Sequence, residues 1–199
     1  LDAEHGVFKP FYVQEKPVDA INIPESRIDL YPEKTIIGLQ ATRGCPYGCE
    51  FCAVSGTKSR QKYRMRPVEK VIDEIKKRPT KNFYFHDNSL TVNPDYTKEI
   101  FRGMKGLNKK FGAFGNINIL GNDDEFLKLA SEAGCVSWAV GFESVCSDSL
   151  AEMGKKTNKV HEYLSAIKKV HDHGMIITGF FVFGFDNDTL NIFEKTDEF

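Results

Sequence analysis

The feature that most constrains the fold is an alternation, from residue 36 onward, of short apolar segments with longer amphipathic ones. The short segments are rich in aromatic and β-branched residues, which is typical of strands. The longer segments repeat apolar residues every three or four positions, which predicts helices. Five strand-helix units with apolar strands indicate an α/β fold with a parallel sheet covered by helices. The predicted strands are 36–39, 82–86, 111–119, 135–142 and 175–185. The predicted helices are 67–78, 94–110, 123–134 with Asn122 as its cap, a helical stretch that follows the fourth strand and ends at about residue 173, and 189–199.

Polar residues follow or end four of the predicted strands. In a barrel, residues at the carboxyl ends of successive parallel strands converge on one mouth, where such folds carry their chemistry. We therefore expect a barrel or partial barrel with its site at that mouth, while a doubly wound sheet would give the same alternation. The residues concerned are Cys45, Asp87, Asn88, Asn118, Glu143 and Ser144.

The first 34 residues differ from the rest of the chain. Prolines recur in this stretch without helical periodicity, which favours an extended connector over residues 1–34 and a core over residues 35–199. The chain begins at Leu1 without Met and stops at Phe199 inside a predicted helix. We expect a core that is truncated after its fifth strand-helix unit.

Charge and hydropathy exclude several classes of protein. Twenty-seven Lys and Arg residues against 28 Asp and Glu leave a net charge of -1, so no overall field attracts nucleic acid or an anionic membrane. The basic residues between Arg43 and Arg66 are more typical of a solvated loop than of an RNA-binding patch. No apolar run reaches the roughly 18 to 20 residues that span a bilayer, and no signal peptide is visible. We expect a cytoplasmic protein that does not bind nucleic acid.

Three of the five cysteines, Cys45, Cys49 and Cys52, form a C-x3-C-x2-C motif. Thiolates are soft ligands for zinc or for an iron-sulfur cluster. A structural zinc site takes four ligands, so that alternative needs Cys135 or Cys146, and an electron-transfer cluster also needs a fourth protein ligand. Three ligands alone favour a four-iron cluster with one iron left open.

The motif, with Phe51 before its last cysteine, resembles the hallmark of the radical S-adenosylmethionine (SAM) enzymes, and the resemblance extends over residues 36–199. It implies a (βα)6 partial barrel of the TIM type, a 4Fe–4S cluster on the three cysteines, and reductive cleavage of SAM to start radical chemistry. Phe51 would then belong to the cofactor site, while the resemblance leaves the catalytic residues unknown.

In the family, the segment after the second strand contacts the amino group of SAM. Asp87 and Asn88 hold that place here, and a side-chain oxygen is the acceptor that an ammonium group needs. The alternative is that both residues only cap the turn before Pro94.

The resemblance also implies contacts after the third and fourth strands. Glu143, with Ser144 beside it, would accept hydrogen bonds from the ribose hydroxyls, and Lys155 would face the SAM carboxylate. Asn118 could reach the ribose, but Asn116 points the same way by strand alternation, and the sequence does not separate the two.

The segments QATRGCPYGCEFC and FGFDNDT most resemble the cobalamin-binding branch of the family. Members of that branch carry a cobalamin domain before the barrel, and some methylate polycyclic lipids. The chain has no D-x-H-x-x-G cobalamin loop, so such a domain would precede Leu1. The resemblance implies methyl transfer to a lipid-like or other small molecule, and a reducing partner such as ferredoxin or flavodoxin.

Overall fold

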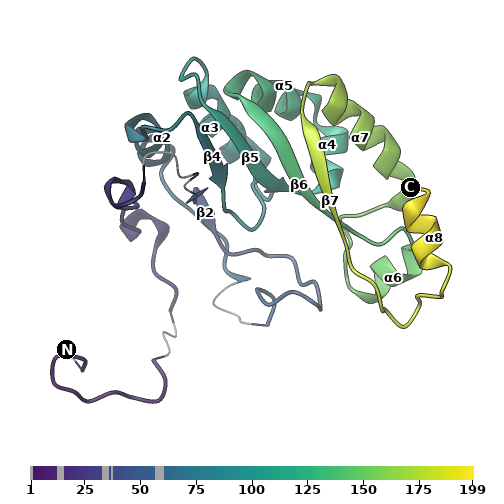
Figure 1. Ribbon diagram of the computed structural model, residues 1–199, viewed down its shortest axis with the longest axis horizontal. Helices are drawn as coiled ribbons and strands as arrows, with labels where there is room; N and C mark the ends of the chain where they lie inside the picture. Colours follow the sequence, from purple (N-terminus) through teal and green to yellow (C-terminus); the bar gives the residue numbers. More distant parts are fainter. Residues whose placement is uncertain (1, 13–15, 33–35, 37, 57–60) are drawn as a thin grey trace.

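Five parallel strands form the central sheet in a computed structural model that describes all residues except 1, 13–15, 33–35, 37 and 57–60 (Figure 1). The strand order β1–β4–β5–β6–β7 follows the chain without reversal, so the fold is of the barrel type and the doubly wound alternative is wrong. The sheet is open, with β1 and β7 at its two edges. The strands are β1 (Gly38–Leu39), β4 (Asn82–Phe85), β5 (Lys110–Gly115), β6 (Cys135–Glu143) and β7 (Ile176–Phe181). The predicted residue Ile37 of the first strand lies outside the described residues.

Helices cover one face of this sheet, and the other face is open (Figure 1). They are α2 (Val68–Lys77), α3 (Pro94–Met104), α4 (Ile117–Asn122), α5 (Asp124–Ala133) and α7 (Tyr163–Asp172). Helices α6 (Ser147–Glu152) and α8 (Ile192–Asp197) lie beyond the carboxyl end of β7 (Figure 1), and short 3-10 turns occur at Ala20–Asn22, Ile28–Leu30 and Val160–Glu162. In the described part of the chain, no helix is long and apolar enough to cross a membrane.

The core lies between the sheet and its helices and is built largely from aromatic rings. Phe126 of α5 is fully buried, with ring centroids 5.3 Å from Phe101 of α3 and 5.7 Å from Trp138 of β6. Burying such a side chain contributes about 1.5–3 kcal/mol, so these contacts hold each helix against its strand. The carboxyl ends of the strands are thereby fixed relative to one another.

The third strand-helix unit differs from its predicted boundaries. β5 ends at Gly115, and residues 117–122 form α4 rather than the end of a strand, because Ile117 and Leu120 are buried at helical spacing. The cap of α5 is Asp123, whose side chain accepts a hydrogen bond from the Phe126 amide, so the predicted cap at Asn122 is wrong. The predicted helix end at Gly134 is confirmed, with φ of 98°.

The loop that carries the cysteine triplet is held by a small hairpin and by buried charges. Strands β2 (Thr42–Arg43) and β3 (Arg64–Met65) pair antiparallel on either side of it. Next to β3, Arg66 pairs with Glu74 of α2 at 2.7 Å, and Glu74 also pairs with Arg78 at 3.0 Å. Both arginines donate to backbone carbonyls near β1, so α2 fixes the start of the cysteine loop.

The described residues of the 1–34 segment are almost all exposed and run away from the sheet (Figure 1). Ala20 is the buried exception. Arg64 donates to the Val18 carbonyl at 2.7 Å, and Lys77 pairs with Glu25 at 2.9 Å. These contacts attach the segment to β3 and α2, while its role as a connector stays a prediction.

Candidate active site

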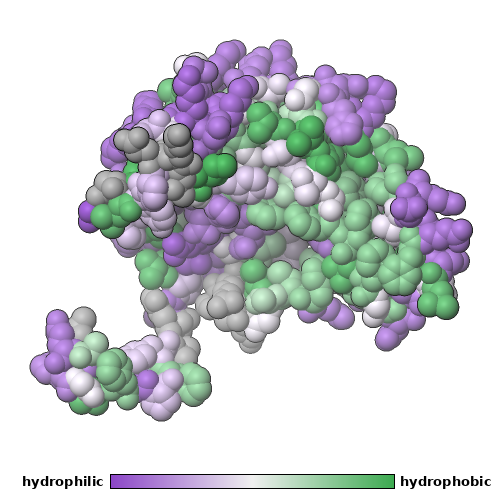
Figure 2. Space-filling model, viewed as in Figure 1, coloured by the Kyte–Doolittle hydropathy of each residue, from purple (hydrophilic) through white to green (hydrophobic). Residues whose placement is uncertain are grey.

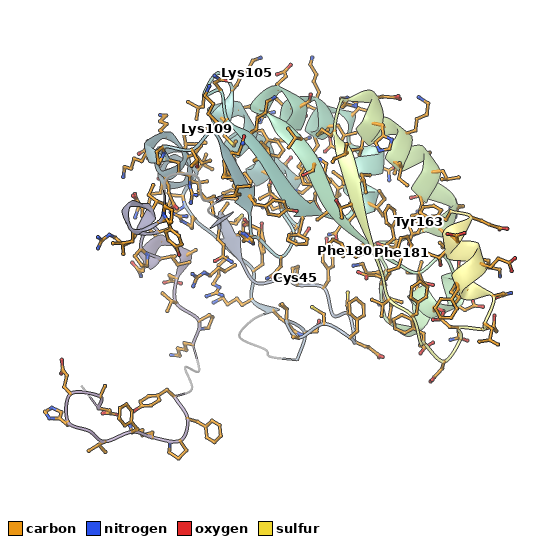
Figure 3. All side chains as sticks on the ribbon, viewed as in Figure 1. Cys45, Lys105, Lys109, Tyr163, Phe180 and Phe181 are labelled. Atoms are coloured by element: carbon orange, nitrogen blue, oxygen red, sulfur yellow. The ribbon has the colours of Figure 1, made fainter. Side chains whose placement is uncertain are left out.

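The three cysteines of the triplet line one pocket at the carboxyl ends of the strands. Figure 3 shows Cys45 in the loop below these ends, on the same side as Phe180 at the end of β7. The pocket opens to solvent at its mouth, and its cavity volume is about 240 Å³. Its lining combines the thiols with polar, aromatic and aliphatic side chains, namely Cys45, Tyr47, Cys49, Phe51, Cys52, Val54, Asn88, Ser89, Phe114, Asn116, Glu143, Lys155 and Phe180, and with small residues of β5 and β6.

None of the three thiols forms a disulfide, and the surroundings of the pocket shift the pKa values of Cys45 and Cys49. Burial raises the pKa of Cys45, and the neighbouring Cys49 and Cys52 raise it further, while Lys155 lowers it. Burial likewise raises the pKa of Cys49, which Lys155 lowers. Thiols must lose their protons to bind metal, and the positive charge of Lys155 favours that loss for Cys45 and Cys49.

Neither of the two other cysteines lies in the pocket as a fourth metal ligand. Cys135 begins β6, at the end of the sheet opposite the pocket, where it is buried and its Sγ lies 3.6 Å from the Ser137 carbonyl oxygen. Cys146 precedes α6 and does not line the pocket. Within the described ranges, no three His, Cys, Asp or Glu side chains are placed to hold a single metal ion. The arrangement does not favour the zinc alternative.

Glu143 and Lys155 form a buried ion pair in the wall of the pocket, with Lys155 Nζ 2.8 Å from Glu143 Oε1. Glu143 has φ of 66°, a left-handed conformation that is costly for a residue with a side chain. It ends β6 just after an irregularity in the pairing with β7, since Gly141 pairs with Phe180 and Glu143 with Phe181. Such bulges redirect side chains beside functional sites.

A glycine makes room for the Glu143 carboxylate. A Cβ at Gly141 would lie 2.1 Å from Glu143 Oε1, so the carboxylate folds back over the strand only because position 141 has no side chain. The carboxylate is therefore held against β6, facing the pocket, while Lys155 neutralises it.

Two buried residues that the sequence analysis missed hold this strained turn. Asn158 Nδ2 donates to the carbonyls of Gly141 and Phe142 at 2.9 and 3.0 Å and lies 3.1 Å from the Tyr163 hydroxyl. That hydroxyl donates to the Phe142 carbonyl at 3.0 Å. Burial raises the pKa of Tyr163 to about 12, so it stays a donor at neutral pH. Asn158 follows two lysines and a threonine in sequence, so nothing local distinguishes it from a solvated loop residue.

Asp87 and Asn88 occupy different environments although they are adjacent. Asn88 is exposed and lines the pocket, whereas Asp87 is buried and accepts hydrogen bonds from the backbone amides of Ala41 and Thr42. Asp87 therefore holds the start of β2, just before the cysteines, by hydrogen bonds and does not line the pocket. Neither residue caps the following turn, because that role belongs to Asn93, which accepts from the Tyr96 amide.

The two asparagines that the sequence could not separate both lie close to the cysteine loop. Asn116, at the end of β5, lines the cysteine pocket beside Tyr47, and its side chain lowers the pKa of Tyr47, which burial raises. Asn118 lies in α4 and lines an adjoining groove together with Tyr47, Cys49 and Lys155, and its Oδ1 is buried with no hydrogen-bond partner among the described residues. Ser144 is buried outside the pocket, where its Oγ accepts from the Cys146 amide.

Comparisons with known proteins agree with this fold and pocket. The sequence profile of the radical SAM superfamily matches residues 39–199. Bacteriochlorophyllide d C-12(1)-methyltransferase of Chlorobaculum tepidum is 32% identical over 100% of this chain and 46% of its own length. Anaerobic magnesium-protoporphyrin IX monomethyl ester cyclase of Cereibacter sphaeroides is 31% identical over 77% of this chain and 26% of its own. The chain thus spans half or less of the length of these relatives.

Among solved structures, the radical SAM methyltransferase TsrM from Kitasatospora setae, with cobalamin and a 4Fe–4S cluster bound, superposes with a TM-score of 0.73. The match has 16% sequence identity and covers 82% of this chain and 31% of that one. At this identity the likeness concerns the fold, and it supports the partial-barrel architecture.

Proposed function

This chain belongs to the radical SAM superfamily, and we propose that it holds a 4Fe–4S cluster on Cys45, Cys49 and Cys52 and cleaves SAM reductively at the open iron. The observation that carries the proposal is the meeting of all three thiols with Glu143 and Lys155 in one pocket. The cluster, when bound, supplies the electron that breaks a carbon-sulfur bond of SAM.

The residues around the triplet match the chemical groups of SAM. Lys155 provides a cation for the carboxylate, and Asn88 provides an amide oxygen for the ammonium. Glu143 and the amide group of Asn116 provide an acceptor and a donor for the ribose. Phe51 and the apolar floor of β5 and β6 limit water around the reacting groups.

Metal binding is the first test of the proposal. Anaerobic reconstitution with iron and sulfide should give about four irons per chain in the unchanged protein, the content of one four-iron cluster. Cys49→Ala should lose the cluster absorption, whereas Cys135→Ser, the matched control, should keep it because Cys135 lies away from the pocket. Zinc in place of iron, with no change in Cys49→Ala, would contradict the proposal.

Nucleotide binding is the second test. Glu143→Ala should weaken SAM binding to the reconstituted protein while the iron content stays unchanged, because the carboxylate faces the pocket but is not a metal ligand. Production of 5'-deoxyadenosine from SAM under dithionite measures the cleavage itself. An unchanged dissociation constant in Glu143→Ala would remove this residue from the site.

For the full reaction, we propose cobalamin-dependent methyl transfer to a polycyclic small molecule, with a tetrapyrrole as the first substrate class to examine. Two relatives more than 30% identical carry names that specify tetrapyrrole substrates. Cobalamin would be bound by a part of the protein outside this chain, and a ferredoxin or flavodoxin would supply electrons. Methyl transfer from labelled SAM to a chlorin acceptor tests this step, and no labelled product with cobalamin and a reductant present would refute it.

A further inference from the structure

The open face of the sheet carries a floor of small residues between aromatic borders. The parallel register places Gly112, Ser137 and Ile176 beside Tyr84 in one row. The next row on the same face contains Phe114, Ala139 and Thr178, and the row nearest the mouth contains Gly141 beside Phe180. On β6 these rows carry only Ser137, Ala139 and Gly141, so little side-chain volume stands over that strand.

Aromatic rings border this floor on β4, β5 and β7. Phe114 makes an edge contact with Tyr84, with ring centroids 5.7 Å apart, and lies nearly parallel to Phe180 at 6.3 Å. Phe180 is 47% exposed although it is a large apolar residue in a strand. Figure 2 shows apolar residues gathered on this face over β6 and β7. The exposed ring of Phe180 gives this face apolar aromatic surface for a conjugated ligand to contact.

His86 lies at the β4 border of the same floor. It follows Phe85, which pairs with Ala113, so the register places His86 beside Phe114. The imidazole is exposed, its ring centroid is 5.5 Å from that of Tyr84, and no described residue hydrogen-bonds to its ring nitrogens. A Cβ at Gly38 would lie 1.8 Å from its Cδ2, so the ring rests against β1 only because position 38 is glycine.

The floor is continuous with the cofactor pocket. Phe114, Ala139, Gly141 and Phe180 belong to both, because they also line the pocket of the three cysteines. A ligand lying on the floor would therefore have one edge at the pocket where SAM is proposed to bind. His86 lies outside that pocket lining, so it can contact the ligand without taking part in cluster or SAM binding.

We propose that this floor binds a flat, metal-centred tetrapyrrole and that the His86 imidazole is the axial ligand of its central metal. The inference rests on the proposed function, because the substrate must reach the pocket in which SAM is cleaved. Neutral imidazole is the commonest protein ligand for metals and suits the open axial position of a magnesium or zinc macrocycle. The apolar floor and the rings of Phe114 and Phe180 bind the macrocycle itself.

Titration with two tetrapyrroles tests the assignment. Zinc protoporphyrin IX should bind the protein with the red-shifted absorption of an imidazole-ligated zinc, and metal-free protoporphyrin IX should bind without it. His86→Ala should lose the red shift and weaken binding of zinc protoporphyrin IX by at least about 10-fold. Removing a residue that only contacts a metal ligand already costs about that much affinity. The same variant should change binding of the metal-free probe by less than about 2-fold, which is smaller than the loss of one aromatic contact.

Two further variants keep the result decisive. Gly38→Ala keeps the histidine but displaces its imidazole ring, so it should also reduce the zinc shift. His171→Ala removes an exposed histidine of α7 and should behave as the unchanged protein. A zinc shift that survives in His86→Ala, or is lost equally in His171→Ala, overturns the assignment, as does the absence of binding of either probe.

The proposed function and this inference fail separately. The probe titration needs neither cluster nor SAM, so it is read on the protein before and after reconstitution. Loss of cluster assembly would contradict the proposed function and leave the zinc shift interpretable. A protein that holds its cluster and binds SAM but shows no His86-dependent shift would refute the tetrapyrrole site alone.

Discussion

The clamp formed by Asn158 and Tyr163 gives a prediction whose size follows from its hydrogen bonds. Tyr163→Phe removes one donor to the Phe142 carbonyl, which keeps Asn158 as a partner at 3.0 Å. The expected loss in the free energy of unfolding is about 0.5–1.5 kcal/mol, one net hydrogen bond. Asn158→Ala removes two donors to backbone carbonyls, so the expected loss is about 1–3 kcal/mol.

The same variants should weaken SAM binding, because the clamp holds the strained conformation of Glu143. A left-handed non-glycine residue costs about 1–3 kcal/mol, and without the clamp the turn can relax and withdraw the carboxylate from the pocket. A loss of about 1.4 kcal/mol corresponds to a 10-fold rise in dissociation constant. We expect roughly that rise for Asn158→Ala and a smaller one for Tyr163→Phe.

The assay combines urea unfolding with calorimetric titration of SAM into reconstituted protein. Tyr96→Phe is the matched control, since the Tyr96 hydroxyl also donates to backbone carbonyls, those of Arg66 and Ala41 at 2.7 and 3.2 Å. Tyr96→Phe should lower the free energy of unfolding about as much as Tyr163→Phe does. It should leave the SAM dissociation constant within about 2-fold of that of the unchanged protein, well below the 10-fold rise expected for Asn158→Ala. If Asn158→Ala destabilises the protein while SAM binds as tightly as before, the clamp does not position Glu143 and the reasoning is wrong.

Three further predictions concern buried charge and close contacts. Glu74→Ala removes the buried carboxylate that pairs with Arg66 and Arg78 and should lower the free energy of unfolding by about 3–5 kcal/mol in urea, against at most about 1 kcal/mol for the exposed Glu132→Ala; equal losses would contradict the role of the buried network. Burial raises the pKa of Asp87 to about 6, so the native state binds its proton more tightly than the unfolded state and the contribution of Asp87 to stability falls as pH rises from about 4 to about 6. The stability of the unchanged protein relative to Asp87→Asn should decline over that interval and then level off, and a pH-independent difference would exclude this titration. Gly141→Ala should displace the Glu143 carboxylate and weaken SAM binding measured calorimetrically, with the iron content of the reconstituted protein as the control; unchanged affinity would show that the contact is not required.

Local patterns predicted most of the architecture because each depends on residues close in the chain. Apolar residues at helical spacing predicted helices over 67–78 and 94–110, which the structure has at 68–77 and 94–104, so the predicted end at 110 is wrong because β5 already begins there. The cysteine triplet is visible from spacing alone. The failure at residues 117–122 has the same origin. Ile117 and Leu120 sit in a short apolar run, and such a run fits a strand or a helix equally well until its packing is known.

The order of strands and helices and the three closely spaced thiols can be read from the chain, because periodicity and ligand spacing are local properties. Which polar neighbours face the pocket depends instead on tertiary packing. Asn88 and Asn116 line the pocket, while Asp87 and Asn118 do not. The carbonyls just before Glu143 are held by Asn158, which lies fifteen positions after Glu143 in the chain. These outcomes depend on where each strand ends and on a bulge in β6, which are set by packing between segments distant in sequence.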